Sequence, residues 1–293
     1  MPSYNLDPKA IATLWQSIFK PEAVLQLEPK VTPDWLNTAF SMEMAVQMAQ
    51  LSHLIYTKDK EERQGAAQQL TLRETASCSI DAMHWSRFES SESPNNASII
   101  CFRGTTDPIH WLYNLNALLI EWPSIGHVHR GFAKAFGKLQ DSLQQELAER
   151  PAETLIMTGH SLGAALAMLF ASLTETQQVY TFGAPRPGTA SFAQTLNRHC
   201  PVHRVVHGLD MVTQLPQHWP ILERRAFVHP GEVVHLQLNG SSAKGADAAL
   251  PEPDHMLRDS LRAMVDGDRL AEPVPALLDH APINYVKALA SAL

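Results

Sequence analysis

The chain has 293 residues, of which 45% are hydrophobic and 18% are charged, and its formal net charge is −7. This composition is typical of a soluble globular protein, and the negative charge argues against nucleic acids and anionic membranes as electrostatic partners. The first 20 residues lack the unbroken apolar segment of a secretory signal, and no stretch is long and apolar enough to span a membrane. We therefore expect a soluble protein without a transmembrane anchor, either cytoplasmic or exported by a signal-independent route.

The predicted elements alternate between helices and strands, which favours an α/β fold with a mostly parallel sheet covered on both faces. We expect one domain, with a helical arm over residues 1–33 and a helix with a core-facing stripe over 34–56. The further expected strands, in chain order, are 79–88 and 97–102 as one hairpin, 155–157, 178–182, 203–206, and 226–228 with 233–238 as a second hairpin. The further expected helices are 130–150, 164–170, 191–198, a short helix 256–265 inside a flexible insertion over about 240–275, and a terminal segment over 275–293.

A Gly-x-Ser-x-Gly segment lies between two of these apolar runs. Residues 155–157 before it are typical of a buried strand, and the Ala-rich residues 164–170 after it are typical of a helix. Gly159 and Gly163 allow the strand and the helix to cross closely around Ser161, as in a nucleophile elbow. The alternative is that Ser161 only caps the helix.

A serine nucleophile needs a base and an acid that orients the base, and in this kind of fold both follow the serine on later loops. Asp210 follows an apolar strand and is the predicted acid, although an aspartate in a solvated turn would give the same pattern. His280, just before the last helix, is the predicted base. His229 and His235 are rivals, but they lie in or beside the expected hairpin, and Asp279 is interpreted as a loop or cap residue.

Donors for an oxyanion are expected at two places. One is the backbone N–H of Leu162, which directly follows the serine. The other is Thr105, in a Gly-containing turn at the end of the strand over residues 97–102. A capped turn without a catalytic role would give the same local sequence at Thr105.

In their order, these motifs resemble those of the class 3 (fungal-type) triacylglycerol lipases. The similarity runs through residues 102–105, 128–132, 158–163, 180–188, 204–216 and, more weakly, 280–285. The resemblance implies an α/β-hydrolase fold with a helical lid and no cofactor. It also implies site roles: a nucleophile at Ser161, an orienting acid at Asp210, a base at His280, and an oxyanion hole at Thr105 and Leu162. Ala164 departs from the family, which often has a second glycine there.

Residues 108–122 form an apolar stripe that directly follows the oxyanion turn. A core helix would show the same stripe, but this is the position of the lid in the family. The residues that we expect in the lid and at the substrate are Ile109, Trp111, Leu112 and Leu115. An opening lid would expose apolar side chains to a lipid surface, so the expected partner is a lipid or other ester at an aggregate or membrane interface.

Metal binding is not expected. The chain contains three widely spaced cysteines, interpreted as buried free thiols: Cys78, Cys101 and Cys200. Three histidines are spaced by four, but they run into a predicted strand, where that spacing does not converge on one ion: His199, His203 and His207. The predicted function is a serine carboxylic-ester hydrolase, a lipase that cleaves acylglycerols. The alternatives are a phospholipase A1, a feruloyl or other carboxylesterase, and a catalytically silent fold that binds lipid or a partner.

Overall fold

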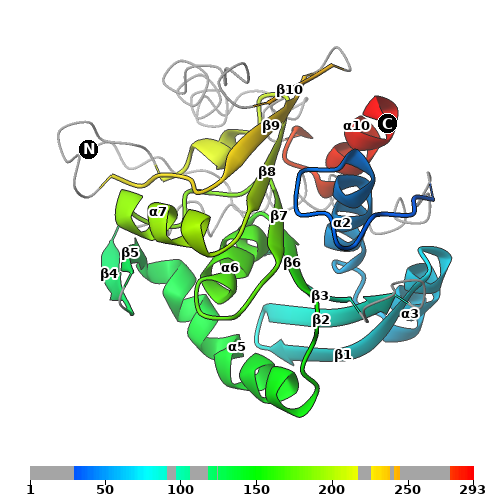
Figure 1. Cartoon of the computed structure of the whole chain (residues 1–293), viewed down its shortest axis with the longest axis horizontal. Helices are drawn as coiled ribbons and strands as arrows, with labels where there is room; N and C mark the ends of the chain where they lie inside the picture. Colours follow the sequence, from blue (N-terminus) through cyan, green and yellow to red (C-terminus); the bar gives the residue numbers. More distant parts are fainter. Residues whose placement is uncertain are drawn as a thin grey trace, which may run out of the picture.

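Eight strands in the described part of the chain form one sheet, in the order β1-β2-β3-β6-β7-β8-β9-β10 (Figure 1). The computed structural model describes residues 30–90, 97–105, 118–123, 125–216, 226–237, 241–244 and 278–293. The strands are β1 (Leu72–Ile80), β2 (Met83–Ser90), β3 (Ser98–Phe102), β6 (Leu155–His160), β7 (Gln178–Phe182), β8 (Val202–His207), β9 (Glu232–Leu236) and β10 (Ser242–Lys244). In this sheet, β3, β6, β7, β8 and β9 pair in parallel. At one edge β1 and β2, and at the other edge β10, pair antiparallel. A second sheet pairs β4 (Leu119–Trp122) with β5 (Gly126–His129).

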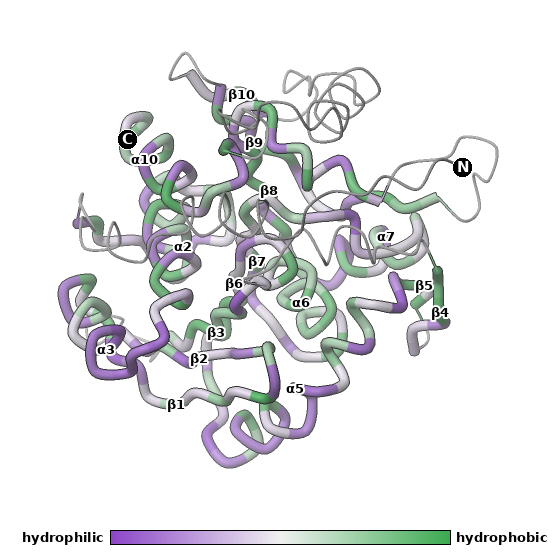
Figure 2. The backbone as a smooth tube through the Cα atoms, turned by 180° about the vertical axis from the view of Figure 1, so that it is seen from behind, coloured by the Kyte–Doolittle hydropathy of each residue, from purple (hydrophilic) through white to green (hydrophobic). Residues whose placement is uncertain are grey.

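Helices cover both faces of the sheet, and its central strands are therefore buried along their whole length. On one face, α2 (Met42–Leu54) packs against α10 (Pro282–Ala292) and β6, and α3 (Lys60–Gln69) packs beside β1. On the other face, α5 (Arg130–Glu149) packs against α6 (Leu162–Ala171). Helix α7 (Ala190–His199) lies beside β5. Figure 2 shows that α6 is largely hydrophobic whereas α3 is largely hydrophilic, in keeping with the central place of α6.

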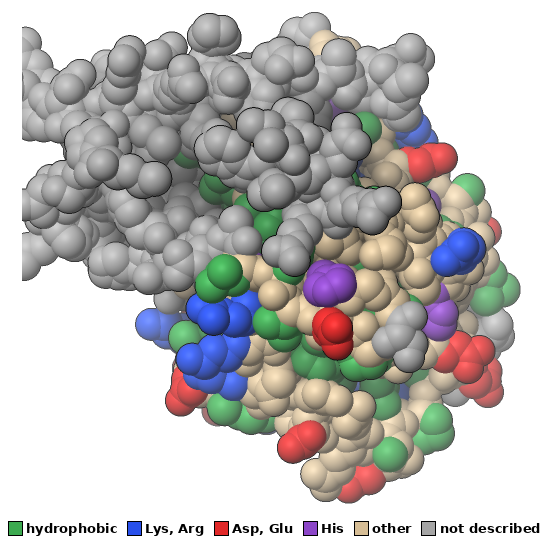
Figure 3. Space-filling view, turned by 90° about the vertical axis from the view of Figure 1, so that its left-hand side faces the viewer, with side chains coloured by type: hydrophobic (Ala, Val, Ile, Leu, Met, Phe, Trp, Pro, Cys, Tyr) green, Lys and Arg blue, Asp and Glu red, His purple; other side chains and the backbone are tan. Residues whose placement is uncertain are grey.

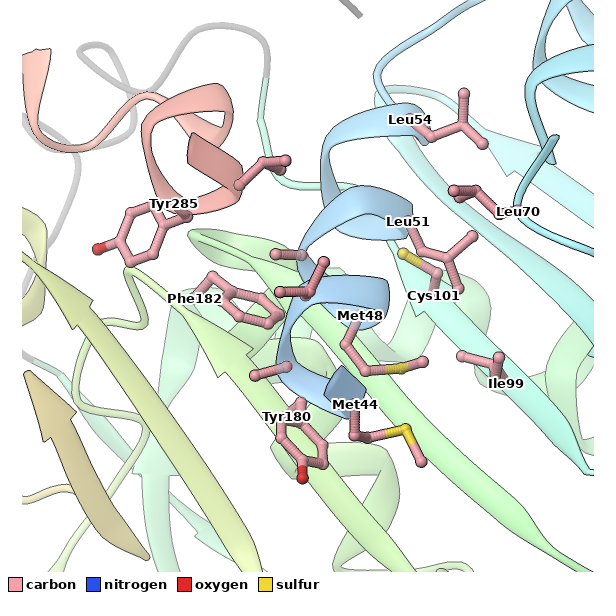
Figure 4. Close-up of a cluster of buried hydrophobic side chains, with 14 of the residues drawn as sticks. Met44, Met48, Leu51, Leu54, Leu70, Ile99, Cys101, Tyr180, Phe182 and Tyr285 are labelled. Atoms are coloured by element: carbon pink, nitrogen blue, oxygen red, sulfur yellow. The ribbon is translucent and has the colours of Figure 1, made fainter. Parts of the chain in front are cut away.

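Each face has its own hydrophobic core. In the core between α2, α10 and the sheet, Met48 and Leu51 of α2 lie on the side that faces β3, and Leu54 points toward Leu70 (Figure 4). The second core lies between the sheet and helices α5 and α6, where Phe102, Phe136 and Phe170 form a run of close ring contacts. The sheet edge at which β6 and β8 end is therefore held between two packed layers.

The predicted fold class is confirmed, and several predicted elements match closely, including α5, α7, β7 and β8. The prediction of a helix over 34–56 is wrong at its start, because α2 begins only at Met42. The side chains of Asp34 and Asn37 accept the N–H groups of Leu36 and Ala39, which competes with helical hydrogen bonds, and Ser41 then caps α2.

The expected strand 233–238 matches β9, and β2 pairs with β3 as the expected hairpin, but two other details of the predicted strands are wrong. The expected strand 79–88 is broken by a tight turn at Asp81 (φ 53°), which separates β2 from the unpredicted strand β1. The expected hairpin 226–238 does not form, because Gly231 (φ 78°) packs against the Val202 carbonyl and directs β9 parallel to β8. Val228 instead bridges to Gly188.

Residues 119–122, at the end of the segment expected to form a helical lid, form strand β4 instead. The expected insertion contains β10, which pairs with β9. The rest of the lid, most of the N-terminal arm and the helix 256–265 lie outside the described residues. Cys101 and Cys200 are buried free thiols, whereas Cys78 is only half-buried.

Candidate active site

Ser161 lies at a sharp turn between β6 and α6, with φ 59° and ψ −127°. This backbone conformation is strained for a residue with a side chain, and it is the geometry of a nucleophile elbow. The two glycines of the motif permit it, because a Cβ on Gly159 would lie 2.5 Å from the Gly163 carbonyl carbon and one on Gly163 would lie 2.1 Å from the Phe102 oxygen. The turn is fixed from the next strand by the Ser161 N–H, which donates to the Phe182 carbonyl at 3.0 Å.

Ser161 directly precedes the first residue of helix α6. The residue is buried, and its Oγ makes no hydrogen bond to another described residue. The first hydrogen bonds of α6 are made by Ala164 and Ala165 to the Ser161 carbonyl, so the N–H groups of Leu162 and Gly163 precede the helical ladder. Such N–H groups can stabilise an anion that forms at the serine.

The predicted oxyanion turn packs directly against the elbow. A Cβ on Gly104 would lie 2.6 Å from the His160 carbonyl oxygen and 3.3 Å from the Ser161 Cβ. Thr105, the next residue, is half-buried at this turn. The expected lid and substrate residues lie outside the described residues: Ile109, Trp111, Leu112 and Leu115.

His280 and Asp210 form a fully buried pair, with 2.8 Å between His280 Nδ1 and Asp210 Oδ2. Asp210 follows β8 and caps a short 3-10 helix, η2 (Met211–Gln214), by accepting the Val212 N–H at 2.9 Å. Tyr285, in the first turn of α10, donates its hydroxyl to the same Oδ2 at 2.5 Å. Burial, and then the negative charge of Asp210, raises the pKa of Tyr285 well above its usual range, so this hydroxyl keeps its proton.

Gly183 leaves the space for this pair. It has φ 57°, and a Cβ at this position would lie 2.6 Å from Asp210 Oδ2 and 2.9 Å from His280 Nδ1. The sequence alone gives no role to Gly183 or Tyr285. Both lie in segments that carry the family resemblance, Gly183 in residues 180–188 and Tyr285 at the end of the weaker segment 280–285.

The rival histidines are occupied elsewhere. His229 Nε2 donates to the Thr213 carbonyl at 2.7 Å, and His235 Nε2 donates to the Gly208 carbonyl at 2.8 Å. Asp279 is a loop residue, as expected, since its Oδ2 accepts the Leu209 N–H at 2.8 Å. Within the described residues, no group of three or more His, Cys, Asp or Glu side chains is arranged to hold a metal ion.

Residues 99–219 match the family model described as lipase (class 3). The matched segment is less than half of the chain, and over this segment the chain is similar to the class 3 lipases. The matched segment includes β3, the oxyanion turn, the elbow and Asp210, whereas His280 lies beyond it.

Known lipases and a phospholipase are similar to part of the chain. A lipase of Rhizomucor miehei is 30% identical over 149 residues, which cover 45% of this chain and 40% of the relative. The chloroplastic phospholipase A(1) DAD1 of Arabidopsis thaliana is 32% identical over 149 residues, covering 40% of this chain and 33% of the relative. A secreted mono- and diacylglycerol lipase of Fusarium solani is 28% identical over 129 residues, covering 40% and 39%. The chain thus spans about two fifths or less of each of these relatives.

Solved lipase structures share the fold over a larger part of the chain. A triacylglycerol lipase whose catalytic centre is described as a serine protease triad superposes with a TM-score of 0.60 at 22% identity, covering 83% of this chain and 95% of that one. The Rhizomucor miehei lipase–propeptide complex gives 0.58 at 22% identity, covering 78% and 84%. These similarities establish the α/β-hydrolase fold for this chain.

The described surface is chemically mixed. On the face in Figure 3, acidic and basic side chains lie on the same part of the molecule rather than on separate sides. No described helix has the length and hydropathy that crossing a membrane would require.

Proposed function

We propose that this chain is a serine carboxylic-ester hydrolase, and specifically a lipase that cleaves acylglycerols. The observation that carries the proposal is the buried Asp210–His280 pair, which lies at the same sheet edge as a serine on a strained strand-to-helix turn. The match of residues 99–219 to the class 3 lipase model and the similarity to known lipases support the same function. The interpretation of Ser161 as a mere helix cap is disfavoured, because its side chain accepts no N–H of α6.

The proposed chemistry follows from the hydrogen bonds. Because the carboxylate of Asp210 can only accept, His280 donates from Nδ1, and its Nε2 is then the basic nitrogen. His280 takes the proton of Ser161 Oγ as this oxygen bonds to the ester carbonyl carbon. The Leu162 N–H and Thr105 stabilise the oxyanion. The alcohol leaves with the proton from His280, and water then releases the acid from the acyl-enzyme by the same steps in reverse roles.

The substrate is proposed to be a lipid ester at an aggregate or membrane interface, with the chain acting as one domain. A second candidate is hydrolysis of phospholipid esters, because a relative of similar identity is named a phospholipase A(1). The same elbow and acid–base pair would serve either activity, so substrate profiling has to separate them.

The deciding assay measures hydrolysis of p-nitrophenyl esters with short to long acyl chains, followed by triacylglycerol and phosphatidylcholine emulsions. We expect ester turnover and fluorophosphonate labelling of the parent protein, and neither in Ser161→Ala. A parent protein that is neither active nor labelled would support a silent lipid-binding fold instead. Equal specific rates below and above the solubility limit of an ester would contradict interfacial action.

A further inference from the structure

The loop that carries His280 is held by side chains at three consecutive backbone carbonyls. Asn284 Nδ2 donates to the Leu278 oxygen at 2.7 Å, from within the same segment. His207 Nδ1 lies 3.2 Å from the Asp279 oxygen, and His160 Nε2 lies 2.7 Å from the His280 oxygen. These two histidines come from β8 and β6, so the sheet itself holds the loop.

The contact of His160 has a defined direction. A carbonyl oxygen only accepts, so His160 must carry its proton on Nε2 and donate it to His280. Burial, and then the charge of His280, keeps the pKa of His160 well below its usual range, so the ring is neutral and its Nδ1 is an acceptor.

The donor to that Nδ1 is the hydroxyl of Tyr56, at 2.9 Å. Burial raises the pKa of Tyr56 above its ordinary value, so this hydroxyl also keeps its proton. The order of donation is therefore fixed from Tyr56 to His160 to the backbone of His280. With both nitrogens engaged, the ring of His160 has one orientation and one tautomer.

His160 also has a special place in the chain, because it immediately precedes Ser161. Its backbone therefore leads into the elbow, while its side chain donates a hydrogen bond to the carbonyl of His280, the proposed base. The rings of His160 and His280 are 4.5 Å apart between centroids, and both residues are fully buried. One residue thus connects the elbow with the loop that carries His280.

We propose that His160 is a positioning residue that sets the distance between Ser161 and His280 by donating a hydrogen bond to the His280 carbonyl. This inference rests on the proposed hydrolase function. His160 itself touches neither substrate nor the transferred proton. Its removal should therefore slow the chemical step and leave substrate binding unchanged.

The first test compares His160→Leu, His160→Gln and His203→Leu. Leucine removes the donor, whereas the glutamine amide restores an N–H at a similar reach. His203 is the matched control, since its Nε2 also donates to a backbone carbonyl, that of Thr38 at 3.1 Å. It lies at the start of β8, whereas Asp210 follows the end of this strand. We expect kcat and fluorophosphonate labelling to fall about 10–100-fold in His160→Leu, with KM within about 2-fold, because small displacements of catalytic groups cost this much. His160→Gln should recover most of the loss, and His203→Leu should label at the parent rate.

Unchanged labelling in a folded His160→Leu variant would overturn the inference while leaving the hydrolase function intact. If the parent protein is neither labelled nor active, the proposed function fails and the inference fails with it. A second measurement needs no variant: ¹⁵N NMR of the parent imidazoles should show His160 as the neutral Nε2–H tautomer. A neutral Nδ1–H tautomer, or a charged ring at pH 7, would overturn the inference even if His160→Leu did not fold.

Discussion

Replacing Gly183 by alanine should disable the acid–base pair with a single methyl group. The new Cβ would lie 2.6 Å from Asp210 Oδ2 and 2.9 Å from His280 Nδ1, closer than the 3.0 Å below which real Cβ contacts are essentially absent. The carboxylate must therefore move by at least about 0.4 Å. It has little freedom to do so, because it is also bonded to Tyr285 and to the Val212 N–H.

Two costs follow from the structure. The left-handed backbone at φ 57° costs about 1–2 kcal/mol for a residue with a Cβ, and overpacking a buried site costs about 1–3 kcal/mol. We therefore expect Gly183→Ala to lose about 2–5 kcal/mol of unfolding free energy. Displacing His280 should lower kcat by about 100-fold with little change in KM, because the role proposed for the pair is in the chemical step rather than in binding.

The assay measures kcat and KM on a soluble p-nitrophenyl ester, together with a urea unfolding curve. Gly137→Ala is the control, since a Cβ there meets nothing within 4 Å on the exposed side of α5. This control should gain about 0.5–1 kcal/mol and keep its activity. A folded Gly183→Ala variant with parental kcat would refute the assignment of His280 and Asp210 as the working pair.

Three further predictions concern stability. Ser161→Gly should unfold at a higher temperature than Ser161→Ala, by about 1 kcal/mol in unfolding free energy, because glycine relieves the strained backbone at φ 59°. Arg63→Met should cost about 3–5 kcal/mol, because it leaves the buried carboxylate of Glu74 without the guanidinium that lies 2.7 Å away. The third concerns His53, whose pKa is lowered to about 4 by burial and then by Lys287. The unfolded chain takes up this proton first, so unfolding free energy should be lost as the pH falls from about 6.5 to about 4, by up to about 1.4 kcal/mol per pH unit.

Each of these has its own control. Equal melting temperatures for Ser161→Gly and Ser161→Ala would contradict the strain. Lys138→Met removes an exposed ion pair with Asp81 and should change the unfolding free energy by less than about 0.5 kcal/mol, in contrast to Arg63→Met. Urea midpoints at pH 7 and pH 5 should differ less in His53→Leu than in the parent, and an unaltered pH dependence would exclude His53 as a contributor.

The elbow could be predicted because all of its signals are local: two glycines, a buried strand before Ser161 and an Ala-rich helix after it. The order of Asp210 and His280 could also be predicted, because each follows or precedes a recognisable element. Their meeting could not, since 2.8 Å between residues 70 positions apart depends on how α10 docks. Gly183 and Tyr285 were missed for the same reason, as their roles exist only once the loops are together.

The errors in secondary structure have a common physical origin. Alternation of hydrophobic residues does not reveal a reversal such as the turn at Asp81, because the pattern continues from β1 into β2. Likewise, Pro230-Gly231 is a good turn sequence, but the partner of β9 was decided by the packing of Gly231 against the Val202 carbonyl. In both places the local pattern did not reveal where the chain reverses or which strand becomes its neighbour.

The docking of α10 on α2 has a consequence for the order of events during folding. These helices belong to opposite ends of the described chain, yet α10 and the turn before it supply both His280 and the Tyr285 hydroxyl. Closing such a long loop is slow compared with forming the hairpins of the sheet. A refolding chain should therefore regain its strands and the Ser161 turn before it regains a base, so the return of catalysis marks the completion of tertiary structure.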